Sequence, residues 1–481
     1  MTYAEFRHRR QRGEFRCRQV VEEFLQRIER QRGLNAFITI SAEQALQAAE
    51  ESDARFDSGS PRLLEGCVVA VKDNISTRGI RTTCASSILE NFVPVYDATA
   101  VERLKAAGAI IIGKANMDEF AMGSSNEYSA FGAARNPHNP DYVPGGSSGG
   151  SAVAVAARLC HVALGSDTGG SVRQPASFCG VVGFKPSYGR VSRYGLVAFA
   201  SSLDQIGILA HTVEDTALLF SVISGHDPRD ATTLPEPPVQ SSLNEGPTVE
   251  ELVVGVLPRS VLQECHPEVW ACYEHCRNAL QEAGAQIVVV EIPFSHAWVP
   301  AYYVIATAEA SSNLARYDGV RYGFRASTEE GEDIITATRT QGFGAEVKRR
   351  IMLGTYVLSA GYYDAYYRKA LKARRLIAEA YARVFTMVHM LLLPTSPVPP
   401  FRLGERIEDP IAMYLSDLFT VSANLAGIPA ISVPAGKSSE GLPIGMQLQA
   451  AYGADARLLY YAHLCSRLWG SGSGTEYPAF E

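Results

Sequence analysis

The sequence predicts one large α/β domain in which helices cover both faces of a central β-sheet. Helix and strand patterns alternate along the whole chain, and the predicted strands are short and mostly apolar, as strands buried on both faces are. The 481 residues are 46% hydrophobic and 20% charged, which suffices for a large core. A prior of about 150 residues per domain suggests about three domains. Large α/β enzymes often remain undivided, however, and we predict a single domain over 1–481.

The N-terminal part, about 1–60, is predicted to be helical. Thr2 and Glu5 have the spacing of a capping box, in which each side chain bonds the other residue's backbone N–H. An apolar stripe with helical period follows over 20–28. Ser41 with Gln44 has the pattern that begins another helix.

The next part, about 61–225, alternates strands with helices and contains the predicted catalytic core. A Gly/Ser loop at 145–151 precedes an Ala/Val-rich helix, and Thr212 with Asp215 has the pattern of a helix cap. A further helix is predicted at 101–107. Apolar runs predict strands at 67–71, 109–112, 162–164 and 181–184.

Residues 226–250 are rich in Pro, Ser, Thr and acidic side chains, which predicts a surface connection. A second lobe is predicted over about 251–470. Its predicted strands lie at 253–257, 287–292, 389–393, 430–433 and 445–448. Its predicted helices begin near 267 and cover much of 299–317, 345–387 and 455–468.

Charge and cysteine content limit the function classes. Lys and Arg total 44 and Asp and Glu total 51, so the net charge is −7. This argues against direct binding of nucleic acid, which needs a basic surface to neutralise phosphates. The nine cysteines are an odd number scattered over the chain, so we expect a reducing cytoplasm and no disulfide framework. We expect neither a signal peptide nor a membrane span, because no apolar run approaches about 20 residues.

The loop Gly145–Ser151 is the densest local signal in the chain. Four of its seven residues are glycines and three are serines, and a helix follows whose first N–H groups point at the loop. A phosphate-binding loop is one interpretation, but the Lys of a P-loop is missing. A flexible linker is the other, and the adjoining proline and apolar helix disfavour it.

A second glycine-rich loop, 165–171, follows a predicted strand and ends in Ser171. Consecutive glycines before a serine expose backbone N–H groups, as an oxyanion hole requires, so Ser171 is a candidate nucleophile. It needs a base, and neither His138 nor His161 lies in a supporting motif. Lys72 ends an apolar strand, where desolvation lowers the pKa of a lysine. The alternative for Lys72 is a side chain that reaches past the strand to solvent.

With Lys72, Ser147 and Ser171 in these contexts, the chain resembles the amidase signature family over nearly its whole length. The resemblance implies a single large domain around a mixed sheet and a Ser–cis-Ser–Lys triad. Ser171 is then the nucleophile, Ser147 the relay serine after a cis peptide bond, and Lys72 the base. The backbone N–H groups of the second loop would form the oxyanion hole: Thr168, Gly169, Gly170 and Ser171.

Five further blocks resemble the branch of this family that serves tRNA-dependent amidotransferases: 118–124, 308–322, 348–354, 361–367 and 417–427. The resemblance implies a glutaminase that makes ammonia. A tRNA-binding partner subunit would use that ammonia, with ATP and Mg²⁺, to amidate Glu-tRNA(Gln) or Asp-tRNA(Asn), and a small third subunit would complete a heterotrimer. This chain is expected to bind no metal or cofactor and to meet tRNA mainly through the partner.

Glutamine carries an α-carboxylate and an α-ammonium, so its pocket needs a cation and an anion. The resemblance assigns these roles to Arg350 and Asp417 and adds Tyr302 and Ser124 as substrate contacts. By itself, Arg350 among neighbouring basic residues is typical of a solvated helix face. Asp417, before an apolar run, is typical of a helix N-cap.

Two other function classes remain open from the sequence. A free-standing amidase with a small neutral substrate would use the same Ser–Ser–Lys chemistry without both charges. A catalytically silent scaffold would hold a tRNA-binding partner, and the intact triad argues against it. The Cys and His residues between 265 and 276 lack the spacing of a zinc site.

Overall fold

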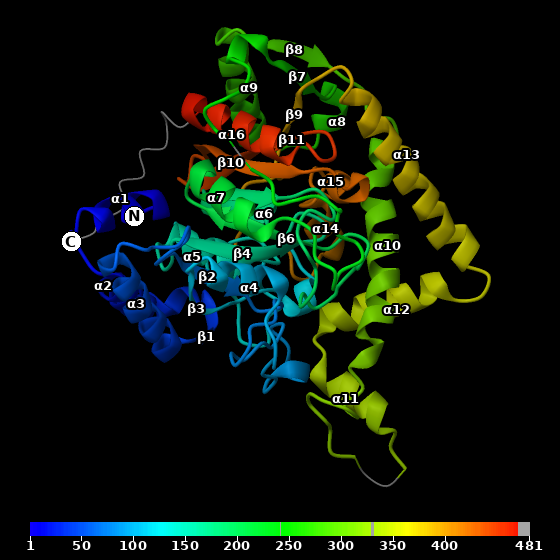
Figure 1. Ribbon diagram of the computed structural model, residues 1–481. Coiled ribbons are helices and arrows are strands. Elements are labelled where there is room, and N and C mark those ends of the chain that lie inside the picture. The colour runs from blue at the N-terminus through cyan, green and yellow to red at the C-terminus, as the bar shows by residue number, and fades with distance from the viewer. Residues whose placement is uncertain (241, 329–330, 470–481) are drawn as a thin grey trace.

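Eleven strands form one mixed sheet within the part of the chain that the computed structural model describes, residues 1–240, 242–328 and 331–469 (Figure 1). The strand order is β1-β3-β2-β4-β6-β5-β10-β11-β9-β7-β8. β2 is parallel to β3 and β4, β7 is parallel to β8 and β9, and the remaining pairs are antiparallel. The strands are β1 Phe37–Ile40, β2 Val68–Lys72, β3 Ile110–Ala115, β4 Val162–Asp167, β5 Val182–Lys185, β6 Gln205–Ala210, β7 Val253–Val256, β8 Gln286–Val289, β9 Met390–Pro394, β10 Ala430–Lys437 and β11 Pro443–Gln449.

Helices surround this sheet, which confirms the predicted α/β class and single large domain. α5 and α6 contact each other and the central strands, while α7 and α16 contact each other and pack on β6 and β10. The helices here are α1 Tyr3–Gln11, α2 Cys17–Arg30, α3 Ala42–Asp57, α4 Thr99–Ala106, α5 Gly149–Ala156, α6 Arg173–Cys179, α7 Val213–Ile223, α8 Arg259–Leu262, α9 Pro267–Glu282 and α16 Asp455–Trp469.

A second group of helices lies along one edge of the molecule, opposite α2 and α3 (Figure 1). α10 packs on α12, α13 and α15, and α11 lies at the lower end of this group. A short π-helix, Tyr363–Arg368, leads directly into α13. The group comprises α10 Trp298–Asn313, α11 Ile334–Gly342, α12 Ala345–Leu358 and α13 Lys369–Val384. Two short helices, α14 Pro410–Leu415 and α15 Val421–Ala426, lie between this group and the sheet (Figure 1).

The predicted helix starts are right at two of three positions. The Thr2–Glu5 capping box is present, and the Thr212 hydroxyl accepts the N–H of Asp215 at 3.1 Å. Ser41 does not cap α3, because its hydroxyl instead donates to the Ile111 carbonyl on β3 at 3.0 Å. The sequence patterns also missed β1 and β6 as strands.

The central strands of the sheet are fully buried, so side chains at their ends lie in a desolvated environment. All five residues of β2 and all six residues of β3, β4 and β6 are buried. Residues 226–240 and 242–248 contain no helix or strand and are largely exposed. Among the described helices, none combines the length and apolar character that a bilayer span needs.

Candidate active site

Lys72 is the last residue of β2 and is fully buried. Its Nζ donates to the hydroxyls of Ser147 and Ser148, both at 2.8 Å, and to the Ser166 carbonyl at 3.2 Å. Burial lowers the pKa of Lys72 to about 7, although nearby carboxylates, Asp118 first among them, act in the opposite direction. The alternative of a lysine reaching to solvent is therefore wrong, and Lys72 can exchange a proton near neutral pH.

The peptide bond between Gly146 and Ser147 is cis. Gly146 has no room for a side chain, because a Cβ would lie 2.1 Å from the Asp118 Oδ2. Its N–H donates to the Gln174 Oε1 at 2.9 Å, and the Asp118 N–H donates to the Ser147 carbonyl at 3.2 Å. These contacts hold the loop so that the Ser147 hydroxyl faces Lys72.

The loop containing Ser171 connects β4 to α6 and is held by a buried ion pair. Arg173 donates through Nε and Nη2 to both carboxylate oxygens of Asp167, at 3.0 and 2.9 Å. A backbone hydrogen bond joins this loop to the Gly145–Ser151 loop: the Ser148 N–H donates to the Ser171 carbonyl at 3.1 Å. Among the described residues the Ser171 hydroxyl makes no hydrogen bond, and Ser171 is only partly buried.

The predicted oxyanion-hole donors are not equivalent. The Gly170 N–H already donates to the Asp167 Oδ1 at 2.9 Å, so it is not free for this role. Thr168, Gly169 and Ser171 have no partner for their N–H groups within the described residues. Tyr302 lies directly against the loop, because a Cβ on Gly169 would be 2.4 Å from the Tyr302 Cζ.

Asp417 and Ser124 lie together although they are far apart in the sequence. The Ser124 hydroxyl donates to the Asp417 Oδ2 at 2.6 Å, and burial raises the pKa of Asp417 to about 7. Gln174, which accepts the Gly146 N–H, also donates to the Ser124 carbonyl at 3.0 Å. Asp417 is not an N-cap, since α15 begins only at Val421. The Asp417 carboxylate is thus linked through Ser124 and Gln174 to the loop that carries Ser147.

Arg350 is only 2% exposed, so the alternative of a solvated helix face is wrong. Its Nε donates to the Glu346 Oε1 at 2.8 Å, one turn earlier on α12. Arg350 lowers the pKa of Asp417, and both charges act on the Tyr302 hydroxyl. Arg350, Asp417 and Tyr302 therefore share one electrostatic environment.

Several residues of the site were missed by the sequence patterns. Ser148 had a signal, because it is part of the Gly/Ser loop and shares Lys72 with Ser147. Glu346 had a weaker one, its spacing of four residues from Arg350 on a helix. Asp118 lies in the family block 118–124, but neither its position nor that of Gln174 indicated contact with the Gly146 peptide, because only the fold brings them there.

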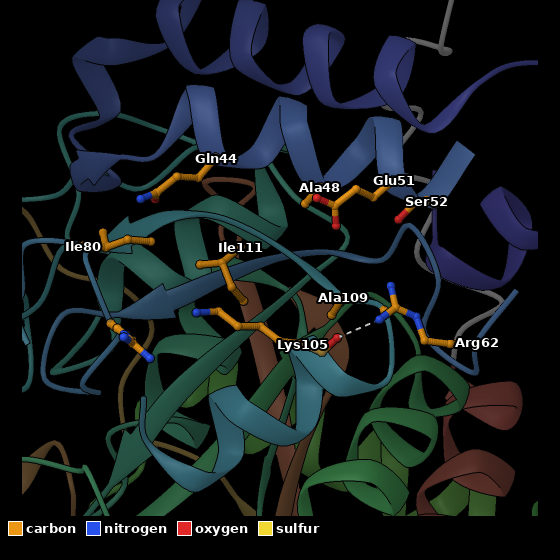
Figure 2. A pocket seen from close by; sticks show the side chains of 11 residues that line it. Gln44, Ala48, Glu51, Ser52, Arg62, Ile80, Lys105, Ala109 and Ile111 are labelled. Carbon is orange, nitrogen blue, oxygen red and sulfur yellow. Dashed lines mark hydrogen bonds between the residues drawn. The ribbon is translucent and has the colours of Figure 1, made fainter. Parts of the chain in front are cut away.

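Four cavities in the described part of the chain have no contribution from Lys72, Ser147 or Ser171. One of about 310 Å³ is lined by α3, α4, β3 and nearby loops, with Arg62 and Lys105 on its wall (Figure 2). Both cations already have carboxylate partners, Glu65 and Asp97. Among the described residues no three His, Cys, Asp or Glu side chains are grouped to hold a metal ion, the Cys/His segment of α9 included.

The site therefore combines a buried lysine, a buried hydroxyl bonded to it, a partly buried hydroxyl beside free N–H groups, and two buried groups of opposite charge. The hydroxyl bonded to Lys72 is that of Ser147, and the partly buried one is that of Ser171. A base, a hydroxyl nucleophile and preorganised N–H donors are the parts that acyl transfer requires.

The sequence of this chain is similar to those of known proteins over nearly its whole length. A curated relative from Thermosynechococcus vestitus, named as the A subunit of glutamyl-tRNA(Gln) amidotransferase, is 55% identical over 434 residues, 89% of this chain and 90% of the relative. A protein of the same name from Koribacter versatilis is 53% identical over 448 residues, 92% and 93% of the two chains.

Solved structures agree with this similarity. The crystal structure of the A subunit of glutamyl-tRNA(Gln) amidotransferase from Thermotoga maritima is 44% identical, with a TM-score of 0.78 over 94% of this chain and 91% of that one. A 6-aminohexanoate cyclic dimer hydrolase solved with its substrate is 27% identical, with a TM-score of 0.84 over 98% and 97%. The family model described as Amidase matches residues 19–459, and the chain therefore belongs to the amidase family.

Proposed function

We propose that this chain is the glutamine-hydrolysing subunit of a tRNA-dependent amidotransferase, and that it produces ammonia for a partner subunit. The observation that carries the proposal is the pair of buried opposite charges, Arg350 and Asp417, of which Asp417 is linked through Ser124 and Gln174 to the loop of Ser147. A neutral amide gives no reason to bury both. The relatives, named as A subunits of glutamyl-tRNA(Gln) amidotransferase, support the same direction.

In the first step the Ser171 hydroxyl attacks the side-chain amide carbon of glutamine. Its proton passes to the Ser147 hydroxyl, which gives its own proton to neutral Lys72 over the 2.8 Å contact. The negative oxygen of the tetrahedral intermediate meets the N–H groups of Gly169 and Ser171, with Thr168 at the edge of the same loop.

In the second step the amide C–N bond breaks. Protonated Lys72 returns the proton through Ser147 to the leaving nitrogen, and ammonia departs. Water then attacks the acyl-enzyme by the same proton route and releases glutamate, which regenerates Ser171.

Glutamine is oriented by its two charged groups. Arg350 takes the α-carboxylate and Asp417, steadied by Ser124, takes the α-ammonium. Tyr302, which lies against the oxyanion loop, contacts the substrate between them. Binding of the ammonium keeps Asp417 ionised, although burial alone places its pKa near neutrality.

The ammonia would serve a tRNA-binding subunit that activates misacylated Glu-tRNA(Gln), or Asp-tRNA(Asn), with ATP and Mg²⁺. A small third subunit completes the proposed heterotrimer, which works in the cytoplasm. This chain itself binds no metal or cofactor in the proposal, and its net charge of −7 leaves tRNA binding to the partner.

The test is Ser171→Ala in the complex purified with its partners. We expect ammonia release from glutamine to be lost while the partners still co-purify; release at the wild-type rate would refute the nucleophile assignment. Ser58→Ala, at an exposed position after α3, is the matched control and should leave both properties unchanged. We also expect the isolated chain to be a weak glutaminase.

The same experiment separates the other function classes. A free-standing amidase would lack co-purifying partners and would prefer a neutral amide over glutamine. A silent scaffold would hold its partners but release no ammonia even as the wild type.

A further inference from the structure

Arg350 is held inside a collar of aromatic rings. Its Cζ lies 5.3 Å from the ring centroid of Tyr414, 5.4 Å from that of Tyr303 and 5.6 Å from that of Phe199. Tyr303 and Tyr414 are stacked on each other, with centroids 4.0 Å apart. The rings come from α10, α14 and the loop before β6, so three separate segments contact one guanidinium.

Glu346 closes the collar on one edge of the guanidinium. Its Oε1 accepts the Arg350 Nε at 2.8 Å and the Tyr414 hydroxyl, also at 2.8 Å. Its other carboxylate oxygen accepts from Arg349. Glu346 is 2% exposed, so this carboxylate is as deeply buried as the arginine that it holds.

The opposite edge of the guanidinium remains open. Within the described residues, Nη1 and Nη2 of Arg350 make no hydrogen bond. A buried arginine is stable only when its charge is compensated and its donors are satisfied. Glu346 supplies the charge and one acceptor, and the two remaining nitrogens form the planar fork that matches a carboxylate.

Burial lowers the pKa of Arg350, but Glu346 first, and then Tyr303, Tyr414 and Tyr302, more than offset this, so its pKa lies well above the usual value. The arginine therefore remains charged at every working pH. What Glu346 adds is orientation: without it, a long side chain has other rotamers and other acceptors.

We infer that Glu346 is the positioning residue for substrate recognition: it holds Arg350, together with Tyr414, so that the free edge of the guanidinium meets the α-carboxylate of glutamine. This inference rests on the proposed function, because it takes the substrate from it. Glu346 does not touch the reacting amide, so it acts on substrate affinity and discrimination. The chemical step is left to Lys72, Ser147 and Ser171.

The test compares glutamine with glutamine methyl ester, which keeps the side-chain amide and the ammonium but lacks the α-carboxylate charge. Ammonia release by the complex is measured for the wild type and for Glu346→Gln. We expect the variant to raise KM for glutamine about tenfold, or about 1.4 kcal/mol, with kcat changed less than threefold. KM for the methyl ester should stay constant, so the preference for glutamine falls by the same factor.

Two further variants make the result decisive. Tyr414→Phe keeps the ring over Arg350 and removes only the hydroxyl that donates to Glu346; we expect about a threefold rise in KM for glutamine alone. Glu379→Gln is the matched control, since Glu379 accepts from Arg375 Nε at the same 2.8 Å and the same spacing of four residues, but on an exposed part of α13. It should change neither substrate's kinetics.

An unchanged KM in Glu346→Gln overturns the inference. An equal loss on both substrates overturns it as well, because that is the result of a purely structural role. If Glu346→Gln does not fold, Tyr414→Phe decides alone, and an unchanged KM there counts against the inference. A wild-type complex that releases no ammonia from glutamine overturns the proposed function and this inference together, which distinguishes the two failures.

Discussion

The pH dependence of ammonia release tests the proposed roles of Lys72 and Asp417 together. Lys72 accepts a proton only when neutral, and Asp417 binds an ammonium only when ionised. Burial lowers the pKa of Lys72 to about 7 and raises the pKa of Asp417 to about 7. Both groups are thus active in their deprotonated forms, and activity must rise with pH through neutrality.

The size of the effect follows from the fully buried position of Lys72 at the end of β2. Between the usual pKa of 10.5 and about 7, the difference corresponds to about 5 kcal/mol at about 1.4 kcal/mol per pKa unit. At pH 8, about nine-tenths of the lysine is then neutral, against well under one per cent for an unperturbed side chain.

The assay is steady-state ammonia release by the complex between pH 5.5 and 8.5. Since kcat/KM reports groups of the free enzyme, its logarithm should fall below pH 6 with a slope approaching two. Bound ammonium keeps Asp417 ionised, so kcat should fall with a slope of one. N-acetylglutamine, which lacks the ammonium, should give slope one in both. A rate that is constant or falls from pH 6 to 8 would refute neutral Lys72 as the base.

Three further predictions concern the walls of the site. Asp417→Asn should raise KM for glutamine at least tenfold and leave KM for N-acetylglutamine unchanged; equal effects on the two in steady-state assays would contradict the ammonium contact. Gly146→Ala should lower the free energy of unfolding by about 1–3 kcal/mol in thermal or urea denaturation, because the added methyl group would lie 2.1 Å from a carboxylate oxygen. Gly33→Ala is the control: this glycine has open space around it, so the same measurement should show almost no change. Asp167→Asn leaves a buried arginine without its charged partner and should cost about 3–5 kcal/mol by urea denaturation; a loss below 1 kcal/mol would show that this pair does not hold the loop.

The fold could be predicted largely from local patterns. Apolar runs locate β2, β3 and β4 because strands buried on both faces need no alternation. β1 was missed because it is only partly buried and short, and β6 because its glycine and its polar first residue weaken the apolar signal. The Ser41 cap failed because a neighbouring strand carbonyl competes for its hydroxyl.

In the candidate site, too, some residues could be predicted from local sequence patterns and others could not. Lys72, Ser147 and Ser171 lie in motifs that can be recognised along the chain. The surroundings that set their chemistry come from distant segments: Asp118 lies against Gly146, and Gln174 joins Gly146 to Ser124. No sequence periodicity links such positions. Only the folded chain shows that the Gly170 N–H already has a hydrogen-bond partner and that Arg350 is buried.

The hydrogen bond between Ser124 and Asp417 joins positions 293 residues apart. The anion of the pocket is therefore synthesised long after the base and the nucleophile. A growing chain that has already made β2, β4 and both serine loops still lacks the group proposed to bind the ammonium of glutamine. Such long-range closure slows folding, but it also means that an unfinished chain is poorly equipped to consume free glutamine before it can join its partners.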